Sequence, residues 1–382
     1  MSILSKSNIQ VLQSKLTQLD TLSDETYEKI LDALEDHLTA PGYTKDKKLK
    51  VAMFDAKSYD LDAFRKINNN EIDIQAHQVP LNQRTAILAK GCKIVCIFVN
   101  DRVDKQVIAE LKRLGIELIA LRCAGFNNVN LAACKQNNID VVRVPAYSPQ
   151  AVAEHALALM LMLNRNLHKA YLRNRSGQFV LDGLVGFNMY QKTVGVVGTG
   201  KIGKCVIDIL LGFGCKVLAY DKYPQDEISN CANVKYVEFP TLLSQSDIIT
   251  LHAPLLDETY HCIDDASIET MKDGVMLINT SRGGLVDTSA LIRGLKTGKI
   301  SAAGLDVYEE EANIFFKDMS NQILNDDVFA RLMSFSNVVV TSHQAFLTHE
   351  ALSNIAHTTI NNILAYKSGK RGEDLPNNVS LN

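Results

Sequence analysis

Three short polar segments carry the side chains best suited to binding a carboxylate and moving a proton. They read INTSRGGLVD (278–287), GLDVYEEE (304–311) and TSHQAF (341–346). Arg282 offers a guanidinium that can grip a carboxylate in a bidentate fork. His343 can give and take a proton near neutral pH. Asp306 and Glu311 are acids of the middle segment.

Each polar segment overlaps the end of an apolar run of strand character. These runs are VMLINTS (275–281), SAAGLDV (301–307) and NVVVTSH (337–343). Ligands of open α/β sheets bind beyond the carboxyl ends of the strands. A polar residue at a strand end is more often solvated or structural when it stands alone. Three such segments at one edge instead predict an active site. Asp287 or Thr288 is the predicted N-cap of the helix that follows the Arg282 segment.

A glycine-rich turn at 193–221 supplies the element around which these strands are organised. The run TVGVV is followed by Gly198, Gly200 and Gly203 in the spacing GxGxxG, and then by an apolar helical pattern. The first glycine allows a tight turn, the second lets a pyrophosphate approach the backbone, and the third lets helix and strand pack closely. The helix N-terminus attracts phosphate. An ordinary βαβ turn without a ligand is the alternative.

The acid at the end of the second strand selects the nucleotide. Asp221 follows the apolar run 217–220. A carboxylate there accepts hydrogen bonds from the ribose hydroxyls and repels a 2′-phosphate, which favours NAD over NADP. The neighbouring Lys222 could soften this preference.

The remaining chain predicts a second α/β domain and two long helical regions. Five apolar strands are predicted at 51–56, 72–79, 93–99, 117–123 and 140–145, and amphipathic helices lie between them. Two further strands of the nucleotide domain are predicted at 234–238 and 247–254. Such alternation indicates parallel sheets covered by helices on both faces. A helix from Gln150 to Arg173 is apolar nearly all round, so it should be buried between domains or subunits. A last helix spans Gln344 to Tyr366.

We therefore predict two doubly wound parallel-sheet domains of α/β class and a helical N-terminal extension. The predicted ranges are 1–48 for the extension, 49–148 with 344–382 for the first domain, and 149–343 for the nucleotide domain. Apolar residues with helical spacing in the extension, and the apolar helix at 150–173, predict a homodimer or a larger homo-oligomer.

Composition excludes several other classes. The chain has 382 residues, 46% hydrophobic and 22% charged, with a net charge of −3, which gives no electrostatic reason to expect nucleic acid or an anionic membrane as partner. The longest apolar run, Ala156 to Leu163, is too short to span a bilayer, and no signal pattern opens the sequence. The 8 Cys lack metal-type spacing, so we expect no metal and reduced thiols in a cytoplasmic protein.

These motifs together resemble the NAD-dependent D-2-hydroxyacid dehydrogenases. The resemblance covers about 49–366 and adds RCAGFNNV (122–129) and VPAYSPQAVAEHALAL (144–159) to the segments already quoted. The stretch FFKDMSNQILNDDVFARL (315–332) is similar to the fermentative D-lactate dehydrogenase subgroup of bacteria. The family implies a flavodoxin-like substrate domain and a Rossmann NAD-binding domain. Residues 1–48 depart from the bacterial pattern, which leaves their role open.

The resemblance also implies roles for individual residues. Arg282 would hold the substrate carboxylate and polarise the carbonyl, His343 would be the acid–base, and Glu311 would pair with it. The substrate site would further contain the backbone N–H groups near Ala124 and Gly125, and an aromatic wall of Phe98, Tyr147 and Phe346. The cofactor site would contain Gly198, Gly200, Lys201, Ile202, Gly203, Asp221, Asp306 and the Thr280 backbone.

The implied activity is reversible hydride transfer between NADH and pyruvate, giving D-lactate. Two alternatives stay open. One is another D-2-hydroxyacid dehydrogenase, such as a glyoxylate or hydroxypyruvate reductase. The other is a NAD-binding regulator of the corepressor type, because a shared fold does not decide function.

Overall fold

The computed structural model describes residues 48–311 and 314–379. The described residues divide into two compact units, of which one contains Ser148–Thr348 and the other contains 48–147 and 349–379. The nucleotide domain was predicted at 149–343. The helices predicted in the N-terminal extension fall within residues 1–47, outside the described part of the chain.

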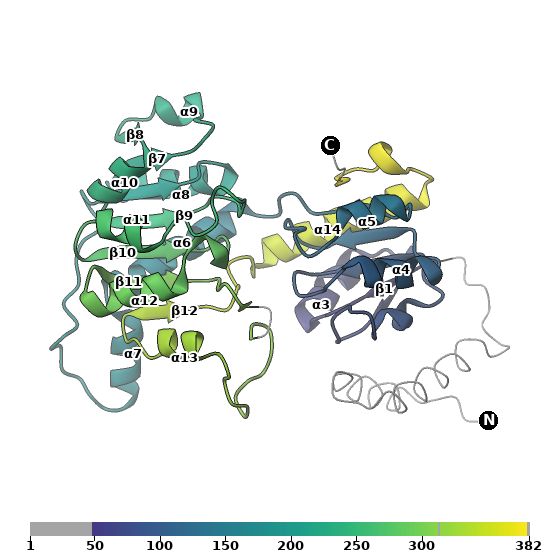
Figure 1. The fold of residues 1–382 in the computed structure, drawn as a ribbon, viewed down its shortest axis with the longest axis horizontal. Helices are drawn as coiled ribbons and strands as arrows, with labels where there is room; N and C mark the ends of the chain where they lie inside the picture. Colours follow the sequence, from purple (N-terminus) through teal and green to yellow (C-terminus); the bar gives the residue numbers. More distant parts are fainter. Residues whose placement is uncertain (1–47, 312–313, 380–382) are drawn as a thin grey trace. The chain divides into compact units, whose positions relative to one another are not determined.

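The first unit is built on a five-stranded parallel sheet (Figure 1). Its strands are β1 (Leu49–Met53), β2 (Ile72–Ala76), β3 (Ile94–Ile97), β4 (Leu118–Leu121) and β5 (Asp140–Val142). The order β2-β1-β3-β4-β5 is that of flavodoxin-like doubly wound folds. All five predicted strands are present, each shorter than the apolar run that predicted it.

Helices from both ends of the sequence cover this sheet. They are α3 (Ser58–Ile67), α4 (Lys105–Arg113), α5 (Leu131–Gln136) and α14 (His349–Lys367), with short 3₁₀ turns at Ala86–Ala89 and Gly372–Asp374. Ile360 and Ile363 of α14 are buried in the same cluster as Phe64 of α3. The predicted helix start at Gln344 is wrong by five residues. The backbone nitrogens of Gln344 and Ala345 donate to the Asp306 carboxylate, so 344–348 form a turn and the helix begins at His349.

The second unit is built on a seven-stranded parallel sheet. Its strands are β6 (Thr193–Val197), β7 (Lys216–Tyr220), β8 (Val234–Tyr236), β9 (Ile248–Leu251), β10 (Val275–Asn279), β11 (Ile300–Leu305) and β12 (Val338–Val340). The order β12-β11-β10-β9-β6-β7-β8 is a Rossmann order with one added edge strand. The strand order reverses between β6 and β9, which is where a dinucleotide binds in this architecture.

Both faces of the larger sheet are buried, which explains its nearly continuous apolar strands. Val194 and Val196 pack in a cluster with α6 (Pro149–Asn164) and α8 (Lys201–Gly212). Val197 packs on the opposite side, in a second cluster. The helices of that cluster are α10 (Phe239–Gln245), α11 (Asp265–Thr270), α12 (Thr288–Thr297) and α13 (Asp327–Met333). Helix α9 (Asp226–Ser229) precedes the edge strand β8.

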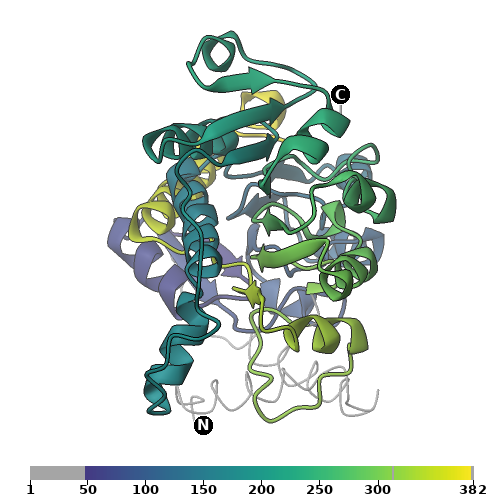
Figure 2. The same ribbon diagram turned by 90° about the vertical axis from the view of Figure 1, so that its left-hand side faces the viewer.

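The single helix predicted from Gln150 to Arg173 is wrong, because the chain forms two helices there. Asn166 adopts a left-handed backbone, with φ of 52°, and separates α6 from α7 (Leu167–Arg175). Helix α6 is buried through most of its length, against strands and α8 of its own unit. Helix α7 has no buried residue and projects from its unit (Figure 2). Within residues 48–311 and 314–379, no helix has both the length and the apolar character that a bilayer crossing requires.

The cysteine side chains are all free thiols, and five of the eight are buried. Burial raises the pKa of Cys92 and of Cys96 to about 12. A thiol with so high a pKa carries almost no thiolate near neutral pH and is therefore unreactive.

Candidate active site

The glycine-rich turn lies at the switch point of the larger sheet, between β6 and α8. Gly198 has φ of 91°, and a Cβ there would lie 2.6 Å from the backbone nitrogen of Ala253. A Cβ on Gly203 would lie 2.0 Å from the carbonyl oxygen of Gly198. Glycine is required at both positions because backbone occupies the space of a side chain. A Cβ on Gly200 would meet no atom within 4 Å, so the backbone there faces open space.

The N-terminus of α8 fits a phosphate group. Gly200 is the N-cap residue, and no side chain caps the helix. The N–H groups of the first turn, from Lys201 to Gly203, have no partner inside the helix, and they carry the positive end of the helix dipole. Uncapped N–H groups beside open space suit the pyrophosphate of a dinucleotide.

Asp221 lies at the end of β7 and is fixed against the glycine-rich turn. Its Oδ2 accepts hydrogen bonds from the backbone nitrogen of Thr199 at 2.6 Å and from the Thr199 hydroxyl at 3.1 Å. Its Oδ1 accepts from the backbone nitrogen of Tyr223 at 2.9 Å. The Tyr236 hydroxyl donates to the Thr199 hydroxyl at 2.9 Å. An ionised carboxylate retains further lone pairs, so ribose hydroxyls can still bind Asp221.

The positive charge beside Asp221 is offset by another residue. The ammonium nitrogen of Lys222 lies 2.8 Å from a carboxylate oxygen of Glu258. Lys222 therefore has a local partner for its charge, and attraction of a 2′-phosphate would have to compete with that partner.

The three polar segments meet at one edge of the larger sheet. Arg282 follows β10, Glu311 follows β11 and His343 follows β12, and these strands are adjacent and parallel. Asn279 shapes the loop that carries Arg282: its amide donates to the Arg282 carbonyl at 2.8 Å, and its oxygen accepts from the Ser281 nitrogen at 3.0 Å. The Nη1 of Arg282 donates to the Ser281 carbonyl at 2.8 Å, so the other donors of its guanidinium can meet a ligand.

His343 and Glu311 form a hydrogen-bonded pair. The Nδ1 of His343 lies 2.8 Å from Oε1 of Glu311, and both side chains are mostly buried. An ionised carboxylate can only accept, so Nδ1 carries the proton and Nε2 is the nitrogen that can exchange one. The second oxygen of Glu311 accepts from the backbone nitrogen of Tyr308 at 3.1 Å, which fixes the carboxylate.

Asp306 holds the turn that carries His343. Ser342 and His343 both have left-handed backbones, with φ of 50° and 56°. The fully buried Asp306 carboxylate accepts from the Thr341 hydroxyl at 2.6 Å and from the backbone nitrogens of Gln344 and Ala345 at 2.8 and 2.9 Å. Two strained residues in sequence cost about 1–3 kcal/mol each, so such a turn persists only when other contacts define it.

Thr280, two positions before Arg282, has a buried hydroxyl. Only 8% of the residue is exposed, and its Oγ1 has no hydrogen-bond partner among the described residues. A buried hydroxyl without a partner loses hydrogen bonding to water and gains nothing in return. A ligand amide bound at the end of β10 would restore that bond, so Thr280 fits a nicotinamide carboxamide.

The predicted substrate-site residues of the smaller unit lie after β3, β4 and β5. The Phe98 backbone nitrogen donates to Asp101 at 2.5 Å, and the ring lies against the buried guanidinium of Arg122, 5.0 Å away. Burial raises the pKa of Asp101 to about 7. The Ala124 carbonyl accepts from Arg143 at 2.8 Å.

The backbone of the RCAGFNNV segment leaves donors for a ligand. The N–H groups of Ala124 and Gly125 bond to no group in the described part of the chain. The Tyr147 carbonyl accepts from the amide of Asn354 at 2.6 Å. Phe346 is buried and belongs to the larger unit, as do Arg282, Glu311 and His343. Phe98, Ala124, Gly125 and Tyr147 belong to the smaller unit.

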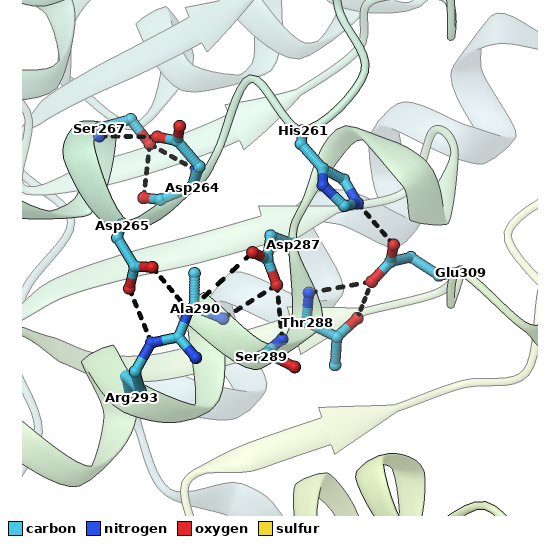
Figure 3. Close-up of polar contacts among 10 residues, drawn as sticks. All are labelled: His261, Asp264, Asp265, Ser267, Asp287, Thr288, Ser289, Ala290, Arg293 and Glu309. Carbon is cyan, nitrogen blue, oxygen red and sulfur yellow. Dashed lines mark hydrogen bonds and ion pairs between the residues drawn. The ribbon is translucent and has the colours of Figure 1, made fainter.

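Two further histidines of the larger unit were not recognised from sequence. Burial lowers the pKa of His252 to about 3, so this ring stays neutral and cannot serve as an acid near neutral pH. His261 forms a second histidine–carboxylate pair, 2.6 Å from Glu309 (Figure 3). The three consecutive acids at 309–311 look alike in sequence, and only geometry assigns Glu309 to His261 and Glu311 to His343.

Comparison with known proteins identifies relatives among the 2-hydroxyacid dehydrogenases. Residues 157–345 match the NAD-binding domain of the D-isomer specific 2-hydroxyacid dehydrogenases. The chain is 49% identical to the D-lactate dehydrogenase of Escherichia coli over 332 residues, which cover 87% of this chain and 100% of the relative.

Solved structures extend the likeness to the fold. One, from a study of the pyruvate reductase of Chlamydomonas reinhardtii, has a TM-score of 0.81 at 46% identity and covers 87% of this chain and 98% of that one. Another is a D-lactate dehydrogenase with NAD⁺ from Lactobacillus jensenii, with a TM-score of 0.72 at 30% identity, covering 86% and 99%.

The switch-point glycines, the uncapped helix and the acid at the end of β7 suit a dinucleotide, and the comparisons agree over nearly the full length of the relatives. The chain therefore belongs to the D-isomer specific 2-hydroxyacid dehydrogenases, and its cofactor is NAD.

Proposed function

We propose that this protein is a D-lactate dehydrogenase, which reduces pyruvate with NADH and catalyses the reverse reaction. The observation that carries the proposal is the hydrogen-bonded His343–Glu311 pair, one strand away from the loop of Arg282, at the edge where an NAD-binding sheet binds its ligands. The relatives named D-lactate dehydrogenase support the choice of substrate.

Arg282 is the proposed anchor of the substrate. Its guanidinium binds the pyruvate carboxylate and lies close enough to the keto oxygen to stabilise the negative charge that develops there. In the smaller unit, the backbone N–H groups of Ala124 and Gly125 are proposed as further donors to a carboxylate. A bidentate contact with Arg282 fixes the orientation of the keto carbon before the reaction.

His343 is the proposed acid–base. In pyruvate reduction its Nε2 gives a proton to the keto oxygen as the carbon–oxygen double bond becomes a single bond, and in lactate oxidation it takes the hydroxyl proton back. A bound NADH supplies the hydride that the keto carbon receives. Glu311 accepts from Nδ1, which keeps the proton on that nitrogen and fixes the orientation of the ring.

Thr280 and Asp306 are proposed to serve the nicotinamide side of the reaction. The unpartnered Thr280 hydroxyl and the neighbouring backbone bind the carboxamide. Asp306 already accepts three hydrogen bonds from the turn at 341–345, so it acts mainly by holding that turn.

We also propose a cytoplasmic location and a homodimer or larger assembly. Eight free thiols suit a reducing compartment. Helix α7 and the segment after it expose large apolar side chains, namely Leu167, Tyr171, Leu172, Phe179, Val180, Leu181, Val185 and Tyr190. A contiguous stretch of this kind marks a protein contact surface, and a second copy of the chain would cover it.

The first prediction concerns cofactor choice. NADH should be preferred over NADPH, because the Asp221 carboxylate repels a 2′-phosphate. Asp221→Ser should raise kcat/KM for NADPH relative to NADH, whereas Lys222→Ala should change the ratio little, since Lys222 is already paired with Glu258. Equal kcat/KM values for the two cofactors in the unmodified protein would contradict this reading of Asp221.

The second prediction concerns the substrate. A panel of 2-keto acids at fixed NADH should give the highest kcat/KM with pyruvate, above glyoxylate, hydroxypyruvate and phenylpyruvate, and chiral analysis should find D-lactate. Phe98→Ala should narrow the gap between pyruvate and bulkier acids, because a pocket wall discriminates by about 1–3 kcal/mol per methylene. No turnover of any 2-keto acid would favour a NAD-binding regulator instead.

The third prediction concerns the acid–base pair. Glu311→Gln removes the carboxylate that accepts from Nδ1 of His343 at 2.8 Å and orients the ring, so kcat/KM should fall in both directions. The loss should be smaller than the loss of about 10²–10⁴-fold expected for His343→Ala, which removes the acid–base itself. The control is Glu310→Gln, which changes an exposed neighbouring acid and should leave kcat/KM unchanged. An unchanged kcat/KM in Glu311→Gln would contradict the proposed role of Glu311.

The fourth prediction concerns assembly. Leu172→Glu combined with Leu181→Glu should lower the mass measured by analytical ultracentrifugation, because charges on both sides of the apolar surface oppose its burial. The matched control is Ile323→Glu, at an exposed apolar residue elsewhere in the same unit. An unchanged mass in the double variant would locate the subunit contact elsewhere.

A further inference from the structure

We propose that Glu309, together with His261 and Thr288, positions Arg282 relative to the Glu311–His343 pair. This inference rests on the proposed function of those three residues. Glu309 lies two positions before Glu311, and Thr288 lies six positions after Arg282. His261 and Glu309 come from two loops and Thr288 is the first residue of α12, and the three meet in one cluster (Figure 3).

Glu309 uses both carboxylate oxygens inside the protein. Its Oε1 accepts from Nε2 of His261 at 2.6 Å, while its Oε2 accepts from the backbone nitrogen of Thr288 at 2.9 Å and from the Thr288 hydroxyl at 2.6 Å. Thr288 is buried, and about a quarter of the His261 and Glu309 side chains is exposed. A carboxylate bonded on both oxygens connects segments instead of binding substrate.

The bond to Thr288 completes the N-terminus of α12. The N-cap Asp287 accepts from the backbone nitrogens of Ser289 and Ala290 at 2.8 and 3.1 Å. Glu309 satisfies the one first-turn N–H that Asp287 does not reach, and its negative charge lies at the positive end of the helix dipole. Loss of Glu309 would leave a buried donor without a partner and would loosen the start of the helix.

The segment after Arg282 also packs directly on the segment before Glu311. A Cβ on Gly283 would lie 2.1 Å from the carbonyl carbon of Tyr308 and 2.4 Å from the backbone nitrogen of Glu309. The two backbones are therefore in contact at Gly283. The hydrogen bonds between the Glu309 carboxylate and Thr288 connect the same two segments at a second point. A shift of one backbone moves the other, because close-packed groups transmit displacement.

His261 brings the third loop into the cluster. Its backbone nitrogen donates to the Gly284 carbonyl at 2.8 Å, and its ring stacks on Tyr260 with centroids 3.9 Å apart. Its φ of 48° is left-handed, a conformation that a histidine adopts only when its surroundings define it. His261 thus contacts the Arg282 loop through its backbone and the Glu311 loop through its side chain.

The expected consequence is a loss of substrate chemistry without a loss of cofactor binding. Arg282 must meet both the carboxylate and the developing oxyanion, and a displacement of about 1 Å can cost about 10²-fold in rate. The glycine-rich turn belongs to other strands and shares no hydrogen bond with Glu309. Glu309→Ala should therefore lower kcat and raise KM for pyruvate while the Kd of NADH stays at its original value.

The experiment compares Glu309→Ala and Glu309→Gln with a matched control, Asp265→Asn. Asp265 pairs with Arg293 of α12 at 2.6 Å and is exposed, so the control removes a carboxylate contact from the same helix without touching the cluster (Figure 3). We expect Glu309→Ala to lose about 10²-fold in kcat/KM for pyruvate, Glu309→Gln to lose less because its amide oxygen still accepts from Thr288, and Asp265→Asn to lose nothing.

A double-mutant cycle with Arg282→Lys separates positioning from general destabilisation. If Glu309 acts through Arg282, Glu309→Ala should cost much less in the Arg282→Lys background than in the original protein. Additive losses, or full activity of Glu309→Ala, would overturn the inference. If Glu309→Ala does not fold, Thr288→Val against Thr288→Ser provides the same test, since only Thr288→Ser keeps the hydroxyl bond. Full activity of Arg282→Lys itself would instead overturn the proposed function of Arg282.

Discussion

The geometry of the candidate active site depends on one buried carboxylate. Asp306 directly follows β11 and is fully buried, where a charge without hydrogen bonds would be very costly. It accepts three hydrogen bonds from the turn after β12, and its own carbonyl accepts from the backbone nitrogen of His343 at 2.5 Å. The left-handed backbones of Ser342 and His343 are tolerated because these bonds define them. Asp306 thus determines where the imidazole lies.

Sequence periodicity predicts most of the fold because both sheets are buried on two faces. Val194 and Val196 pack in one core and Val197 packs in the other. Because both faces of each strand are buried, the strands are continuous apolar runs, which are easy to recognise in the sequence. The break at Asn166 and the late start of α14 are less visible, since single residues with unusual backbone angles are selected by tertiary contacts. The same holds for Glu309 and Glu311, whose partners lie 48 and 32 positions away.

Two helix N-termini of the larger unit differ in whether their first N–H groups are already hydrogen-bonded within the protein. Helix α8 begins at Gly200 without a side-chain cap and beside open space, which leaves its first N–H groups for phosphate. Helix α12 begins at Asp287, and Glu309 completes its cap, so its N–H groups are satisfied within the protein. Both motifs are glycine-rich in sequence, and the presence of nearby carboxylates decides which of them can receive an anion.

The side chains assigned to the reaction are each held in place by a neighbouring polar group. Asn279 shapes the loop of Arg282, Asp306 shapes the turn of His343, and the Tyr308 nitrogen fixes Glu311. These contacts exist without substrate, so the donors need little reorganisation when charge develops on the keto oxygen. Strands β10, β11 and β12 run parallel in adjacent positions, which places the three loops side by side. The doubly wound sheet therefore supplies the proximity, and the buried polar contacts supply the orientation that proton and hydride transfer require.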